Sequence, residues 1–162
     1  MHKRIIIVGR GGSGKDFLRK KLADKNFKYA VSYTTRPARE GEIEGVDYFF
    51  ITKARAKQMI ENGEFFECIE FNGWLYGTSI DQWLQKDGEM VYIMTPTGLS
   101  HVNEEDRKEC FVIYTNPDAE IIKERLAQRN MPGDSLERRI DADTKDFENF
   151  SNYDIQITNP DF

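Results

Sequence analysis

The sequence predicts an α/β fold in which a parallel sheet lies between layers of helices and a small mixed lobe is inserted. Short apolar runs alternate with segments of helical periodicity along most of the chain, and this pattern is typical of parallel sheets. The alternation breaks down in residues 33–78, which we assign to the inserted lobe. A chain of 162 residues is typical of one domain, so residues 1–32 and 79–162 form the predicted core.

The first strand is predicted at residues 5–8, because a run of β-branched residues is typical of a strand buried on both faces. Glycines follow, and then Phe17, Leu18 and Leu22 recur at helical spacing. Further short strands are predicted at residues 90–94, 111–114 and 155–157, with helical faces at residues 121–126 and 136–147. Strands joined through helices in this way form right-handed crossovers and a parallel sheet.

The inserted lobe has a different pattern, with short strands predicted at residues 47–51, 65–71 and 74–76. One helix is predicted at residues 53–62 and ends at Gly63, a residue type that favours helix C-termini. Between the last two arginine-bearing helices lies an irregular stretch, and we expect a mobile, arginine-rich lid at about residues 128–140.

The composition excludes several classes of function. A net charge of −5 and a pI near 5.2 make nucleic acid and anionic membranes poor partners. No apolar run has the length of a membrane span, and the N-terminal apolar run is too short for a signal peptide. Cys68 and Cys110 have no metal-like spacing and indicate a reducing compartment. We expect a cytoplasmic protein, monomer or homodimer, that acts on small molecules.

A phosphate-binding loop (P-loop) is predicted between the first strand and the first helix. Residues 9–15 match the pattern G-x-x-x-x-G-K in the strand–loop–helix context that this motif requires. Glycines allow backbone N–H groups to point inward, and the helix N-terminus adds partial positive charge. A glycine-rich turn between core elements is the alternative, and the context favours a nucleotide triphosphate site. The predicted binding residues are Gly9, Gly11, Gly12, Ser13, Gly14 and Lys15. Lys15 is also a predicted catalytic residue, because it supplies a full charge for the β and γ phosphates.

Asp16 follows the lysine, where Ser or Thr usually provides a hydroxyl ligand for Mg²⁺. A carboxylate also binds Mg²⁺ well, so we predict Asp16 as a metal ligand. The alternative is that Asp16 stabilises the first turn of the helix through its charge.

Further motif blocks lie at residues 31–42 (V-S-Y-T-T-R-P-A-R-E-G-E), 45–48 (G-V-D-Y), 64–67 (E-F-F-E) and 71–78 (F-N-G-W-L-Y-G-T). Together with the P-loop, these blocks closely resemble the guanylate kinase family, and the resemblance extends nearly to the C-terminus. It implies a P-loop three-layer fold. It also implies ATP- and Mg²⁺-dependent transfer of a phosphoryl group to GMP or dGMP in purine nucleotide metabolism. Members of the family usually continue into another helix, whereas this chain stops at Phe162.

The resemblance also implies roles for residues of the lobe. The acceptor phosphate would be held by Arg36, Arg39, Tyr48 and Tyr76, and the guanine would be faced by Ser32, Glu67 and Thr78. The chemistry agrees, because arginines fork onto phosphate and a glutamate accepts from the N1–H and amino group of guanine. Each residue also has a structural alternative: loop arginines that pair with Glu40 and Glu42, core tyrosines, and a glutamate on an exposed face. The spacing of the whole set favours the functional interpretation.

The last helices carry arginines that match those that close over the triphosphate in guanylate kinases. Arg125, Arg129 and Arg139 match best, and positioned arginines stabilise the charge of phosphoryl transfer. For Arg138 we favour a surface partner such as a nearby glutamate. Asn159 matches the family position near the adenine.

The chain departs from the family at residues 92–97, where guanylate kinases usually have acidic residues near the base and the metal. We hypothesise that Asp16 partly replaces this lost charge. The loop G-S-G-K-D and the non-acidic strand also resemble ribose bisphosphate phosphokinases, which are our second match because their acceptor lobe is less similar. A non-catalytic, peptide-binding guanylate-kinase-like module ranks lower, because such modules tend to lose the P-loop.

Overall fold

The computed structural model describes residues 4–85, 88–129, 134–159 and 161, and it has an α/β core built on a parallel sheet. The sheet has five strands in the order β2-β7-β1-β8-β9, and every neighbouring pair is parallel. The bounds are β1 Arg4–Gly9, β2 Lys28–Tyr29, β7 Met90–Ile93, β8 Cys110–Thr115 and β9 Ile155–Ile157. The predicted fold class is confirmed, although the two-residue strand β2 was not foreseen.

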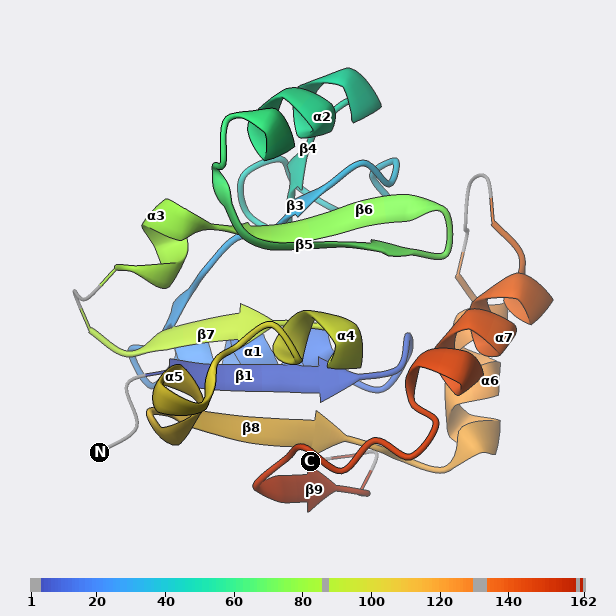
Figure 1. Ribbon diagram of the computed structural model, residues 1–162. Coiled ribbons are helices and arrows are strands. Elements are labelled where there is room, and N and C mark those ends of the chain that lie inside the picture. Colours follow the sequence, from blue (N-terminus) through green and yellow to red (C-terminus); the bar gives the residue numbers. More distant parts are fainter. Residues whose placement is uncertain (1–3, 86–87, 130–133, 160, 162) are drawn as a thin grey trace.

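Both faces of this sheet are buried under side-chain clusters. Successive residues of a strand point to opposite faces, so neighbours in sequence belong to different clusters. Ile7 faces a cluster with Leu18 of helix α1, whereas Ile6 and Val8 face a larger cluster that contains Trp83. Figure 1 shows α1 behind the sheet and α4 and α5 in front of it. The helices of the core are α1 Lys15–Ala23, α3 Ile80–Trp83, α4 Pro96–Leu99, α5 Glu104–Lys108, α6 Ala119–Ala127 and α7 Leu136–Asp146.

A second sheet has four strands in the order β4-β3-β6-β5 and lies above the first in Figure 1. Strands β3 and β4 are parallel, whereas β3–β6 and β5–β6 are antiparallel. Asn72 and Gly73 form the tip of the β5–β6 hairpin with φ angles of 54° and 84°, as expected for a two-residue turn. The bounds are β3 Tyr33–Thr34, β4 Phe49–Phe50, α2 Lys53–Glu61, β5 Phe65–Phe71 and β6 Trp74–Ser79.

The strand predicted at residues 47–51 is reduced to Phe49–Phe50, because a tight loop with Gly45 N–H donating to Tyr48 O precedes it. The predicted lid includes residues 130–133, which lie outside the described residues. Within the described ranges, no helix is long and apolar enough to cross a membrane.

Candidate functional site

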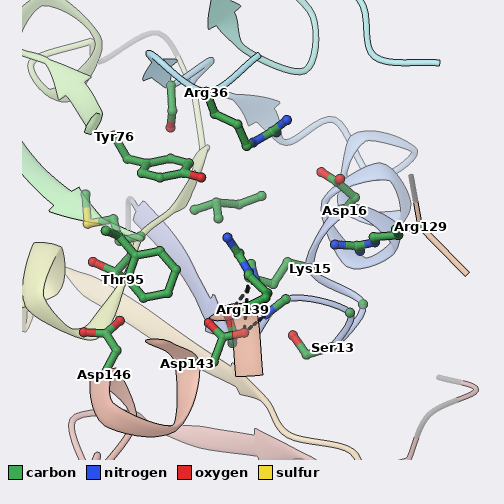
Figure 2. A pocket seen from close by; sticks show the side chains of 18 of the residues that line it. Ser13, Lys15, Asp16, Arg36, Tyr76, Thr95, Arg129, Arg139, Asp143 and Asp146 are labelled. Atoms are coloured by element: carbon green, nitrogen blue, oxygen red, sulfur yellow. Dashed lines mark hydrogen bonds and ion pairs between the residues drawn. The ribbon is translucent and has the colours of Figure 1, made fainter. Parts of the chain in front are cut away.

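A pocket of about 310 Å³ is lined by residues from both sheets and from the C-terminal helices. Residues that the sequence assigned to the donor and to the acceptor contribute to the same cavity. They are Gly9, Gly11, Gly12, Ser13, Gly14, Lys15, Asp16, Ser32, Arg36, Arg39, Tyr48, Tyr76, Arg125, Arg129 and Arg139. Figure 2 shows Arg36 on one side of this pocket and Lys15 and Arg139 on the other.

The P-loop turns between β1 and α1 through glycines in the left-handed region. Gly12 and Gly14 have φ angles of 77° and 97°, which other residues adopt at a cost. The ammonium of Lys15 donates hydrogen bonds to the backbone oxygens of Gly9 and Arg10, at 2.5 and 2.9 Å. Burial lowers the pKa of Lys15 to about 7, against an opposing effect of Asp143. An entering phosphate would therefore stabilise the charged form of this lysine.

Asp16 lies at the pocket, where Arg19 holds one of its carboxylate oxygens. Arg19 Nε donates to Asp16 Oδ1 at 2.9 Å, and Arg19 Nη2 donates to Asp47 Oδ1 at 2.6 Å. Burial raises the pKa of Asp16, but Arg19 outweighs it, so the pKa lies below its usual value and the carboxylate stays charged. The buried Arg19 thus joins the helix after the P-loop to the loop that carries Tyr48.

The arginines of the acceptor side lie close together. Both Nη atoms of Arg36 donate to the carboxylate of Glu42, at 2.8 and 3.0 Å, and its guanidinium lies over the ring of Tyr48. The pairing of Arg36 with Glu42, which the sequence offered as a structural alternative, is therefore present. Arg36 nevertheless lines the pocket. Burial and then the neighbouring charge of Arg36 lower the pKa of Arg39 to about 10. Crowded cations of this kind favour the entry of an anion.

A buried polar pair lies behind the acceptor side. Thr78 Oγ1 donates to Glu67 Oε1 at 2.8 Å, and Glu67, Thr78 and Ser32 are all buried. Burial raises the pKa of Glu67 despite the opposing hydrogen bond from Thr78. Ser32 lines the pocket, whereas Glu67 and Thr78 are not among its lining residues. Their burial excludes the alternative of a glutamate on an exposed face.

The lid arginines approach the P-loop from α6 and α7. Arg125 Nη1 donates to Gly12 O at 3.1 Å. Arg139 is buried, and its Nε and Nη1 atoms have no hydrogen-bond partner. Burial and then the charge of Arg139 lower the pKa of Arg129. Buried guanidinium donors without acceptors are the groups that a polyphosphate satisfies.

Two further positions differ from the sequence interpretation. Arg138 does not need a glutamate partner, because its Nη2 donates to Asn72 O at 3.0 Å. Asn72 also donates to Asp134 Oδ2 at 2.7 Å, so the start of α7 is bonded to the tip of the β5–β6 hairpin. Asn159 is exposed, accepts a hydrogen bond from Asp161 N–H and is not among the residues that line the pocket.

Sequence reasoning missed two acidic residues of α7 that line the pocket. Asp143 is buried and accepts a hydrogen bond from Gly11 N–H at 3.0 Å. Asp146 accepts from Thr97 Oγ1 at 3.0 Å, its Oδ2 is buried without a partner, and burial raises its pKa. The spacing of Arg139 and Asp143, one helical turn apart, was the only sequence signal that could have indicated a pair.

The acidic groups are compatible with Mg²⁺ bound mainly by phosphate and water. Among the described residues, no three His, Cys, Asp or Glu side chains are placed to hold a metal ion. Mg²⁺ usually takes one or two carboxylates and completes its octahedron with water and substrate phosphates. A single carboxylate such as Asp16 at the pocket fits this pattern.

Comparisons with known proteins point to one family. The family model described as guanylate kinase matches residues 1–162. A guanylate kinase of Bacillus subtilis (strain 168) is 34% identical over 163 residues, which cover 96% of this chain and 79% of the relative. That of Lactococcus lactis subsp. lactis (strain IL1403) is 32% identical over 161 residues, covering 96% and 78%. The crystal structure of guanylate kinase from Anaplasma phagocytophilum matches with a TM-score of 0.73 and 25% identity, covering 98% of this chain and 77% of that one.

Proposed function

The chain belongs to the guanylate kinase family, and we propose on that premise that it transfers the terminal phosphoryl group of ATP to GMP or dGMP, with Mg²⁺ as cofactor. It is a nucleoside monophosphate kinase, and its substrates are small nucleotides. One observation carries the proposal for the site: two separate sets of cationic groups, one at the P-loop and one in the loop after strand β3, line a single cavity.

On the donor side, the P-loop backbone, Lys15 and the lid arginines bind the triphosphate. The buried, unpartnered donors of Arg139 support a role in stabilising the equatorial oxygens during transfer. Asp16 would hold Mg²⁺ together with phosphate oxygens, and the bound ion would neutralise further charge. Asn159, which lies outside the pocket lining, is assigned to the adenine by its match to the family position.

On the acceptor side, Arg36, Arg39, Tyr48 and Tyr76 hold the phosphate of GMP, while Ser32, Glu67 and Thr78 face the base. The phosphate of a nucleoside monophosphate is largely deprotonated near neutral pH and is its own nucleophile, so no general base is needed. The protein aligns the two substrates and neutralises their charge. The buried Glu67–Thr78 pair supports recognition of a polar base edge rather than of a bare sugar phosphate.

The test is a coupled assay of ADP release with Mg-ATP and five acceptors: GMP, dGMP, AMP, UMP and ribose bisphosphate. We expect Mg²⁺-dependent turnover with GMP or dGMP and little with the others. Turnover of ribose bisphosphate in place of GMP would contradict the proposed acceptor. Binding of GMP without any ADP release would indicate a binding module. We also propose that the protein is cytoplasmic and is a monomer or a homodimer.

A further inference from the structure

Asp143 places a buried carboxylate against the backbone of the P-loop. Its side chain comes from α7, is 4% exposed, and accepts the Gly11 N–H bond through Oδ2. The same oxygen lies 3.6 Å from Arg139 Nε. Figure 2 shows Asp143 below Arg139, with dashed lines for these contacts. One carboxylate oxygen therefore engages two kinds of group that bind phosphate in P-loop proteins, a loop N–H and an arginine.

The absence of a side chain at Gly11 permits this arrangement. A Cβ atom there would lie 2.9 Å from Arg139 Nε and 3.3 Å from Asp143 Oδ2. Both groups therefore approach the loop closely because residue 11 is a glycine. Burial lowers the pKa of Lys15, and Asp143 is the strongest of the charges that oppose this effect. The loop N–H, Arg139 and Lys15 are thus all influenced by the same acid.

Asp143 satisfies Arg139 only in part. At 3.6 Å the contact with Nε is an ion pair and is too long for a hydrogen bond. Arg139 is 8% exposed, and its Nε and Nη1 atoms have no hydrogen-bond partner. A phosphate group presents more oxygens in a tetrahedral arrangement and can accept from several of these donors at once. Asp143 thus supplies part of what a phosphate would supply.

We propose that Asp143 is an internal competitor for the polyphosphate chain of ATP and ADP. When no nucleotide is bound, its carboxylate takes the Gly11 N–H and neutralises part of Arg139. The phosphates must displace it, and its negative charge weakens their binding. This inference deepens the proposed function and depends on the donor site lying at this loop. In kinetic terms, the competitor shortens the time that ADP remains bound.

The test measures ADP binding by calorimetry, without metal and in EDTA, for wild type and for Asp143→Asn. The variant keeps the shape of the side chain and removes its charge. We expect ADP to bind about tenfold more tightly, on the scale of one charge-assisted hydrogen bond. Asp143→Ser should change affinity in the same direction. Asp141→Asn is the matched control, because Asp141 is an exposed acid on the same helix and should leave the affinity unchanged.

Several outcomes would contradict the proposed competition. Unchanged or weaker ADP binding by a folded Asp143→Asn variant would overturn the proposal. The titrations are repeated with Mg-ADP, and a loss of affinity seen only there would also overturn the proposal and would identify Asp143 as a metal ligand. If wild type binds no ADP at all, the proposed donor site fails instead. A readout that needs no variant is the ¹³C shift of the Asp143 carboxyl, which should move when ADP displaces it; a constant shift counts against competition.

Discussion

The two sides of the cavity hold their cations in different ways. On the acceptor side, Arg36 is 4% exposed and is already paired with Glu42 through two hydrogen bonds. On the loop side, Lys15 donates to backbone carbonyls, and Arg139 keeps buried donors without acceptors. Each side thus has an internal acid, but Glu42 satisfies Arg36 through two hydrogen bonds, whereas Asp143 leaves buried donors of Arg139 for the nucleotide. Variants on the two sides should accordingly differ in what they damage.

The largest effect is expected at the loop. Lys15→Ala should reduce turnover by about 10²-fold or more, because it removes an electrostatic stabiliser of the transferred group. Steady-state assays with Mg-ATP and GMP measure this effect. Lys20→Ala, at an exposed position of the same helix, is the control. Turnover near the wild-type rate would contradict the P-loop assignment.

On the acceptor side, a substitution should lower the stability of the folded protein as well as its activity. Glu42→Gln removes the charge that Arg36 faces inside the protein, and we expect a loss of about 2 kcal/mol in the free energy of unfolding. Urea denaturation measures it. Glu64→Gln is the control, because Glu64 pairs with Arg55 where the side chains are 39% and 46% exposed. That variant should lose less than about 1 kcal/mol. Equal losses would show that the Arg36–Glu42 pair is no better than a surface pair.

A pH dependence is expected on the donor side. In the free protein, the pKa of Lys15 is about 7, and bound phosphates should raise it. Above pH 7, nucleotide binding then takes up a proton, so the Kd for ADP should rise by up to about tenfold per pH unit. Calorimetry at pH 8 in buffers of different ionisation enthalpy detects the uptake. Lys15→Ala should abolish it, and proton release instead would refute this expectation.

Base selection should depend on Glu67. Glu67→Gln removes the carboxylate that accepts from guanine, so the preference for GMP over AMP should fall by about tenfold while kcat changes less. Competition assays with both acceptors measure the ratio. An unchanged preference would show that Glu67 does not read the base.

The smallest effect concerns the metal. If Asp16 supplies metal-side charge, Asp16→Ser should raise the Mg²⁺ concentration needed for half-maximal activity a few-fold, on the scale of one carboxylate ligand among several. Arg19→Met tests the other role, since Arg19 is bound to Asp16. If both variants behave alike and the Mg²⁺ requirement is unchanged, Asp16 serves only to hold Arg19.

Most of the fold was predictable because its signals are local. The β-branched run of β1 and the glycines that follow it fix a strand and a tight loop within a dozen residues. Strand β2 was missed because Lys28–Tyr29 carries no periodicity and exists only through pairing with β7.

The acids of α7 show where sequence reasoning stops. Asp141 and Asp143 are equivalent in type and lie two positions apart on one helix, yet the first is exposed and the second is buried. The contact that distinguishes them joins Asp143 to Gly11 across 132 residues. No local pattern indicates such a contact, so Asp143 resembled an ordinary solvated residue until the packing of α7 was known. The pairing of Arg36 with Glu42 was accessible, because the two residues lie close in sequence.

The bond between α7 and the β5–β6 hairpin has a mechanical consequence. Strand β6 spans Trp74–Ser79, so the hairpin tip lies about 20 Å from the point where the chain returns to the core. If the second sheet rotated about that point, the tip of the hairpin would move further than the base of the hairpin, because displacement grows with distance from the point of rotation. The hydrogen bonds of Asn72 with Asp134 and Arg138 lie at the tip, where a small rotation gives the largest displacement. Two hydrogen bonds at the tip resist this rotation better than the same bonds would near the base of the hairpin.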